Sequence, residues 1–136
     1  MNSSHTFPIT LALDGAILVI DDEPDIREAL TDILSMFTEV PVYAAANGHE
    51  GLQIFQQAQQ PIVLVFLDMN MPVMNGEETY ARLQQIAPEV KVIISSSLSQ
   101  AETTHRLGQH KPPTLLQKPF GINTLLQTLV TLFAMP

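Results

Sequence analysis

Short apolar runs alternate along the chain with stretches whose apolar residues recur every three or four positions. Apolar runs bounded by turn residues predict strands that are buried in a sheet, whereas the wider spacing predicts helices with one buried face. The predicted strands are 16–20, 40–45, 62–67, 91–95 and 114–117. The predicted helices are 26–37, 51–58, 79–86, 99–107 and 122–133. The helix at 99–107 has the weakest apolar stripe, so we expect it to be the least firmly held.

This order of elements predicts an α/β fold with a parallel sheet and right-handed crossovers. Pro41 lies inside the second strand, and proline belongs on an edge strand because it lacks a backbone N–H. With that strand at one edge, we predict a doubly wound five-stranded sheet in the order 2-1-3-4-5. The 136 residues suit one domain, which we place at 15–134 after a leader or linker at 1–14.

Composition excludes several classes of function. The chain has 14 acidic and 6 basic residues, and its formal net charge is −8. The basic residues are never adjacent, which argues against a nucleic-acid surface. There is no cysteine for a thiolate metal site or a nucleophile. No apolar run approaches the roughly 18 residues of a membrane span, and no secretory signal is visible, so we expect a cytoplasmic domain without membrane contact.

Polar residues follow four of the predicted strands. Asp21 and Asp22 follow the first, Asp68 the third, Ser96 the fourth and Lys118 the fifth. Ligands of open α/β sheets bind at the carboxyl ends of the strands, so these side chains are expected to converge there. Three close carboxylates repel one another and favour a bound cation. Oxygen ligands without His or Cys favour Mg²⁺, which leaves coordination positions for a phosphoryl group.

The same residues suggest chemical roles. Asp68 is suited to be a carboxylate nucleophile that forms an acyl phosphate. Ser96 and Lys118 can offer a hydroxyl donor and a positive charge to phosphoryl oxygens. Each residue also has a simpler explanation, since Asp21 and Asp22 could cap a helix and the others could be ordinary loop residues. Their joint placement at strand ends is what favours a site.

Taken together and in order, these motifs resemble the receiver domain of bacterial two-component response regulators, which has a flavodoxin-like fold. The motifs are Asp21-Asp22-Glu23-Pro24, residues 68–76, Ser96 and Lys118-Pro119-Phe120. The ordered set is far more specific than any one motif, and the resemblance covers about residues 15–134.

The resemblance implies that Asp68 accepts a phosphoryl group from a phosphohistidine on a histidine kinase or phosphotransfer domain. It implies that Asp22 binds Mg²⁺ directly and Asp21 through water, with Asp68 and the backbone carbonyl of Asn70 completing the protein ligands. An isolated domain of this kind is a phosphoacceptor that phosphorylates itself from a donor, with possible autodephosphorylation, and is not an enzyme in its own right.

The resemblance also implies a switch. Lys118 would pair first with Asp68 and then with the phosphoryl group, and Ser96 would swing to hydrogen-bond that group. The Lys118–Pro119 peptide bond is often cis in the family. The face formed by helix 99–107, strand 114–117 and helix 122–133 would then change its affinity for a downstream protein partner.

Three residues depart from the family pattern. Leu115 stands where the family usually has an aromatic residue that rotates with the switch, and Ser97 stands where Ala or Gly is usual. Leu98 is apolar and cannot assist a water molecule that attacks the acyl phosphate. The alternative is therefore a degenerate receiver that acts only as a docking or dimerisation module, against which the intact set of site residues argues.

Two other functions on similar folds fit less well. An aspartyl phosphatase needs a second acid two residues after its nucleophile, and that residue here is Asn70. An FMN-binding protein needs a phosphate loop rich in Gly and hydroxyl groups after the first strand, where Asp21, Asp22 and Glu23 would repel the phosphate.

The parent architecture is predicted only from short signals. Residues 6–11 resemble the last strand of a histidine kinase ATP-binding domain, and residues 116–120 resemble receivers of hybrid kinases. A frayed leader is the simpler explanation of the first segment. Because no DNA-binding domain fits after Phe133, we expect either a stand-alone receiver or the receiver of a hybrid sensor histidine kinase.

Overall fold

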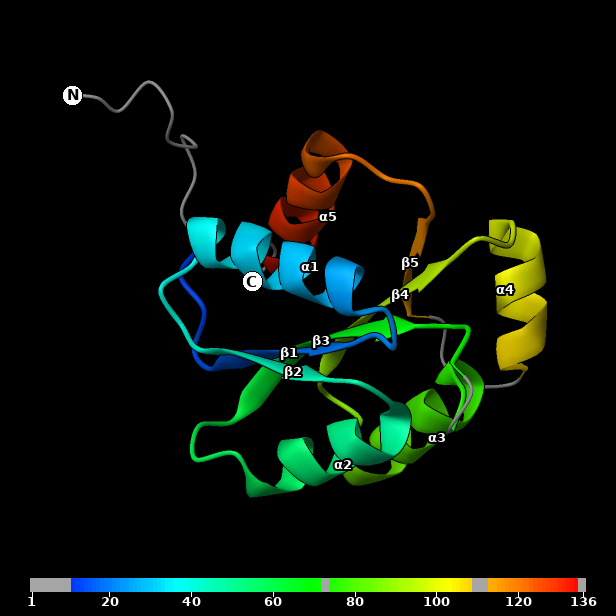
Figure 1. The fold of residues 1–136 in the computed structure, drawn as a ribbon, viewed down its shortest axis with the longest axis horizontal. Helices are drawn as coiled ribbons and strands as arrows, with labels where there is room; N and C mark the ends of the chain where they lie inside the picture. The colour runs from blue at the N-terminus through cyan, green and yellow to red at the C-terminus, as the bar shows by residue number, and fades with distance from the viewer. Residues whose placement is uncertain (1–10, 72–73, 109–112, 135–136) are drawn as a thin grey trace.

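The computed structural model describes residues 11–71, 74–108 and 113–134, in which strands and helices alternate along the chain (Figure 1). The elements are β1 Ala16–Ile20, α1 Pro24–Phe37, β2 Val42–Ala45, α2 Gly48–Gln57, β3 Ile62–Asp68, α3 Gly76–Ile86, β4 Lys91–Ser96, α4 Gln100–Leu107, β5 Thr114–Gln117 and α5 Ile122–Ala134. The strands pair in parallel in the order β2-β1-β3-β4-β5. The predicted fold class and strand order are confirmed.

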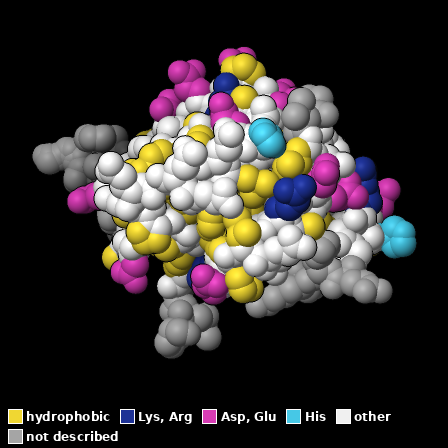
Figure 2. Space-filling view, turned by 90° about the horizontal axis from the view of Figure 1, so that it is seen from below, with side chains coloured by type: hydrophobic (Ala, Val, Ile, Leu, Met, Phe, Trp, Pro, Cys, Tyr) yellow, Lys and Arg dark blue, Asp and Glu magenta, His cyan; other side chains and the backbone are white. Residues whose placement is uncertain are grey.

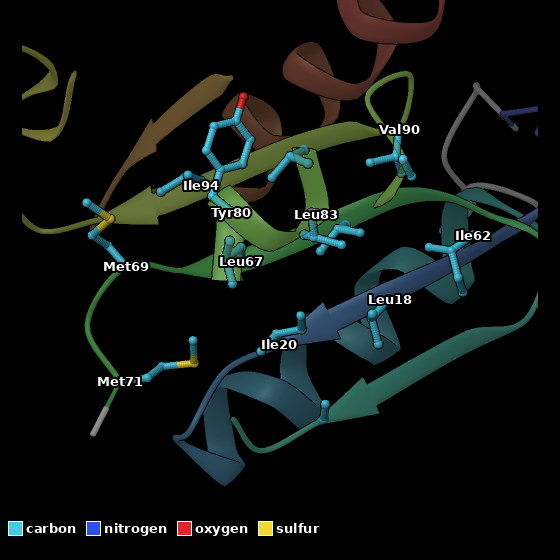
Figure 3. Close-up of a cluster of buried hydrophobic side chains, with 14 of the residues drawn as sticks. Leu18, Ile20, Ile62, Leu67, Met69, Met71, Tyr80, Leu83, Val90 and Ile94 are labelled. Atoms are coloured by element: carbon cyan, nitrogen blue, oxygen red, sulfur yellow. The ribbon is translucent and has the colours of Figure 1, made fainter. Parts of the chain in front are cut away.

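Helices cover both faces of the sheet, with α1 and α5 on one face and α2 and α3 on the other (Figure 1). Successive side chains of a strand point to opposite faces, so Ile17 and Val19 of β1 pack toward α1 and α5, whereas Leu18 and Ile20 pack toward α2 and α3. Figure 3 shows the cluster on the face covered by α2 and α3, in which Tyr80 of α3 lies among the strand residues. This double burial explains the continuous apolar runs and holds the strand ends firmly in place.

Several predicted boundaries were wrong: α1 begins at Pro24 and α3 at Gly76, before the predicted starts at 26 and 79, and β2 and α2 differ for local reasons. Strand β2 begins at Val42, one residue after Pro41, although its place at the sheet edge is as predicted. The carbonyl of Pro41 still accepts a hydrogen bond from the Ile17 N–H, at 3.0 Å. Helix α2 begins at Gly48 because Asn47 caps it, its side chain accepting a hydrogen bond from the Glu50 N–H at 2.8 Å.

Helix α4 is held by few buried side chains. Thr103 and Leu107 are buried, whereas Ala101 is exposed. An ion pair between Arg106 of α4 and Glu77 of α3 spans 3.3 Å, but both side chains are substantially exposed, so it adds little stability. The burial of α4 therefore rests on two residues, of which only Leu107 is apolar.

The amino ends of the strands form the opposite end of the molecule from the polar strand ends. A hollow of about 640 Å³ lies there, lined in part by Phe55, Ile86, Val90 and Phe133. Figure 2 views the face covered by α2 and α3, and hydrophobic side chains gather near the middle of that face. Because its lining includes the first residues of β3 and β4, this hollow is not part of the site that carries the polar residues.

The segment before β1 contacts the same face as α1. The Leu11 N–H donates a hydrogen bond to the Phe37 carbonyl at 2.7 Å, and Leu11 and Leu13 pack partly against the α1–α5 cluster. Residues 6–10, compared above with a kinase strand, lie outside the described residues. Among the described helices, none combines the length and apolar character that crossing a bilayer requires.

Candidate functional site

The polar residues at the strand ends meet at one edge of the sheet. Asp21 and Asp22 follow β1, Asp68 ends β3, Ser96 ends β4 and Lys118 follows β5, and these four strands are neighbours. One carboxylate oxygen from each of Asp21, Asp22 and Asp68 lies within 4.8 Å of the others. The Lys118 ammonium nitrogen lies 3.1 Å from Oδ1 of Asp68. The sequence analysis therefore identified groups that the fold does bring together.

Asp68 is a buried carboxylate with an unusual affinity for protons. Its exposed fraction is only 3%. Burial first, and then the nearby charge of Asp21, raise the pKa of Asp68 from 3.8 to about 6, against the opposing effects of Lys118 and the Asn70 N–H. That N–H donates a hydrogen bond to Oδ1 at 3.3 Å. Near pH 7 the carboxylate is still largely ionised, which a nucleophile requires.

Asp21 is fixed by three hydrogen bonds. Its N–H donates to the Ala45 carbonyl of β2 at 3.1 Å, and its Oδ1 accepts from the Glu23 N–H at 2.9 Å. Its backbone carbonyl accepts from Nη1 of Arg27 at 2.7 Å. Burial is the main cause that raises the pKa of Asp21, while the Glu23 N–H and then Lys118 lower it. Two neighbouring buried acids thus both hold protons more tightly than usual.

The donor set fits a divalent cation. Asp21 and Asp68 are buried, Asp22 is half-buried, and all three offer carboxylate oxygens within 4.8 Å of one another. Hard oxygen donors suit Mg²⁺, and positive charge here would relieve the repulsion that contributes to the raised pKa of Asp68. Asn70 is exposed, and its backbone N–H contacts Asp68, so its backbone lies at the rim of the pocket.

Ser96 connects the site to the loop that precedes α4. Its side chain is buried, and its Oγ accepts a hydrogen bond from the Leu98 N–H at 3.0 Å. Its carbonyl accepts from the Lys118 N–H at 2.7 Å, which ties the ends of β4 and β5 together. The Lys118–Pro119 peptide bond is cis. One residue beyond Leu98, Ser99 caps α4 by accepting a hydrogen bond from the Glu102 N–H at 3.1 Å.

Sequence reasoning missed two residues that shape the site. Gly76 entered the sequence analysis only as the last residue of the motif 68–76, yet a Cβ on it would lie 2.7 Å from the Asp68 carbonyl oxygen and 2.7 Å from the Met69 Cα. Its lack of a side chain lets α3 begin directly against the end of β3. The other is Arg27, whose one available signal was its position as a basic residue among the acids that follow β1.

The fold and the pocket define an α/β domain with a cluster of acidic residues at the carboxyl edge of its parallel sheet. Comparison with protein families identifies the class further, because the response regulator receiver domain family matches residues 17–130. The chain belongs to this family and is a receiver domain of two-component signalling. Receiver domains are phosphoacceptors that interact with histidine kinases or phosphotransferases and with output domains.

Known relatives agree with this assignment. The probable C4-dicarboxylate response regulator DctR of Bacillus subtilis is 31% identical over 114 residues, which are 83% of this chain and 50% of that protein. The nitrate/nitrite response regulator NarL of Escherichia coli is 32% identical over 89 residues, 65% of this chain and 40% of that protein. The chain thus spans half or less of the length of these two relatives.

Solved structures show the same fold. The chemotaxis protein CheY4 of Vibrio cholerae superposes with a TM-score of 0.75 at 28% identity, covering 88% of this chain and 98% of that one. A chain from the CheX–CheY–BeF₃–Mg²⁺ complex of Borrelia burgdorferi gives a TM-score of 0.77 at 24% identity, covering 87% and 88%. The second likeness supports the fold alone.

Proposed function

We propose that Asp68 accepts a phosphoryl group, in a Mg²⁺-dependent reaction, from a phosphohistidine on a histidine kinase or phosphotransfer domain. The observation that carries this proposal is the buried Asp68 carboxylate, 3.1 Å from the Lys118 ammonium and within 4.8 Å of two further carboxylates. Such a pocket supplies a nucleophile, a counter-charge for phosphoryl oxygens and oxygen ligands for a hard cation.

In the transfer, an oxygen of Asp68 attacks the phosphorus and the phosphorus–nitrogen bond of the phosphohistidine breaks. The electron pair of that bond stays on the imidazole, and the product is an acyl phosphate on Asp68. Lys118 is already placed beside Asp68, so its charge can move to the phosphoryl oxygens without a large rearrangement. Asp21, Asp22, Asp68 and the Asn70 carbonyl would hold the Mg²⁺, which supplies positive charge to the phosphoryl oxygens when bound.

Phosphorylation would be communicated through Ser96. The modification adds about −1.5 to −2 charges, and the Ser96 hydroxyl can turn to donate a hydrogen bond to a phosphoryl oxygen. This rotation of the Ser96 hydroxyl would break the hydrogen bond that its Oγ accepts from the Leu98 N–H in this structure. That loop leads into the sparsely buried helix α4, so the face formed by α4, β5 and α5 would change its affinity for a downstream protein.

Labelling with a small phosphodonor tests the assignment of Asp68. The wild-type chain with Mg²⁺ and acetyl phosphate should gain one phosphoryl group by intact-mass measurement, and should bind beryllofluoride. Asp68→Asn should do neither, whereas Asp25→Asn, which changes an exposed acid on α1, should behave as wild type. Equal labelling of the wild type and Asp68→Asn would remove Asp68 from this role.

A melting experiment tests the cation. Mg²⁺ binds the folded acid cluster and not the unfolded chain, so millimolar Mg²⁺ should raise the Tm of the wild type. Asp22→Asn, which removes one of the clustered carboxylates while leaving the buried pair intact, should reduce that rise. A Tm that does not respond to Mg²⁺ would contradict the proposed metal site.

A further inference from the structure

Arg27 reaches back from α1 to the backbone of the site. Its guanidinium Nη1 donates to the Asp21 carbonyl at 2.7 Å, a short bond strengthened by the positive charge of the donor. The residue is itself anchored within its helix, because its N–H donates to the Glu23 carbonyl at 2.9 Å and its carbonyl accepts from the Thr31 hydroxyl at 2.8 Å. The guanidinium is therefore held against the turn that joins β1 to α1.

The contacted carbonyl has a special position between two of the clustered acids. The peptide group is planar, so the carbonyl of Asp21 and the nitrogen of Asp22 belong to one rigid unit. Holding the carbonyl fixes the direction from which Asp22 leaves the strand. The N–H of Asp21 is held by Ala45 and its Oδ1 by the Glu23 N–H, so Arg27 supplies the restraint on the side of Asp21 that faces Asp22.

We propose that Arg27 is a positioning residue for the cation site: it locks the Asp21–Asp22 peptide so that both carboxylates face Asp68. This assignment rests on the proposed function, since it concerns the same acid cluster. A planar guanidinium suits the task because its donors have fixed directions, whereas a lysine ammonium is a mobile point charge. The role is indirect, because Arg27 acts through the backbone of Asp21.

The positioning role and a purely electrostatic role predict opposite signs. Arg27 is a positive charge beside an anionic pocket, so its removal should by charge alone strengthen the binding of a cation. If Arg27 holds the peptide, its removal should weaken cation binding, because the carboxylates lose their arrangement. Loss of a partner that orients metal ligands typically weakens binding by about 10- to 100-fold.

The test compares Arg27→Met, Arg27→Lys and Arg82→Met in the full chain. Arg82 is an exposed residue of α3, so its replacement is a matched loss of one positive charge. The dissociation constant for Mg²⁺ is measured by calorimetry at pH 8. We expect Arg27→Met to weaken binding by about 10-fold or more, Arg27→Lys to weaken it less, and Arg82→Met to match the wild type.

Each outcome decides the assignment. If the wild type binds Mg²⁺ and Arg27→Met binds it equally or more tightly, Arg27 is not a positioning residue, while the proposed function stands. A wild type that binds no Mg²⁺ overturns the proposed metal site and this assignment with it. If Arg27→Met does not fold, Arg27→Lys carries the test, because it keeps the charge and loses the directed donors; an affinity equal to that of the wild type would then overturn the assignment.

Discussion

The Lys118 ammonium and the Asp68 carboxylate, 50 positions apart in the chain, form a 3.1 Å ion pair at the carboxyl edge of the sheet. The two partners are unequally buried, with exposed side-chain fractions of 26% for Lys118 and 2% for Asp68. The buried carboxylate has little water to stabilise its charge and depends on the lysine for that purpose. Lysine can still be solvated when it leaves the pair, so the pairing constrains Asp68 more than Lys118.

Removal of Lys118 should make Asp68 a weaker acid. The ion pair and hydrogen bond from Lys118 lower the pKa of Asp68 against the effect of burial, so Lys118→Met should raise that pKa above 6. Titration of the Asp68 carboxyl carbon by NMR in metal-free buffer measures this change. Lys91→Met, an exposed residue at the opposite end of β4, serves as the control. An unchanged Asp68 titration in Lys118→Met would contradict the geometry of the pair.

Asp68 should destabilise the metal-free domain at neutral pH. Its pKa is about 6 in the folded chain and near 3.8 when unfolded, so the folded state binds more protons between these values. Stability should therefore fall as pH rises from about 4 to 6 and stay reduced above that. Asp68→Asn removes the charge, so at pH 8 its Tm should be higher and its free energy of unfolding larger, by at most about 3 kcal/mol.

The pH dependence distinguishes this effect from a generic gain in stability. The difference in Tm between Asp68→Asn and the wild type should be largest above pH 6 and should shrink toward pH 4. Asp14→Asn changes an exposed acid before β1 and should alter the Tm little at any pH. A difference that stays constant from pH 4 to pH 8 would show that charge burial at Asp68 is not its cause.

The sequence predicts the site well where a residue follows directly from its element. Asp68 was found because an unbroken apolar run places it at a strand end. Parallel pairing then brings that end beside the ends of the other strands. Arg27 and Gly76 were missed because their roles depend on contacts with the backbone of other elements, which no local pattern encodes. Ile122 fits the apolar stripe of α5, yet as the first residue of that helix it is 41% exposed.

The hydrogen bond from Leu98 to Ser96 should be measurable before any phosphorylation. Ser96→Ala removes the acceptor of the Leu98 N–H, so hydrogen exchange at Leu98 should accelerate and stability should fall by about 1 kcal/mol. Ser96→Thr keeps the hydroxyl and should preserve slow exchange. If the Leu98 amide exchanges equally in Ser96→Ala and the wild type, Ser96 does not restrain the loop before α4.

The close approach of α3 to the end of β3 should make Gly76 intolerant of a side chain. A Cβ at Gly76 would lie 2.7 Å from both the Asp68 carbonyl oxygen and the Met69 Cα, which are backbone atoms that cannot move independently. Gly76→Ala should therefore lower the free energy of unfolding by about 1–3 kcal/mol in urea titrations, as overpacking does elsewhere. Gly121→Ala is the matched control, because a Cβ there meets nothing within 4 Å. It should change stability by less than about 0.5 kcal/mol.

The displacement of β3 in Gly76→Ala should also move the Asp68 carboxylate, so Gly76→Ala should bind Mg²⁺ more weakly than Gly121→Ala. Equal stability and equal Mg²⁺ affinity in the two variants would show that the start of α3 does not fix the end of β3.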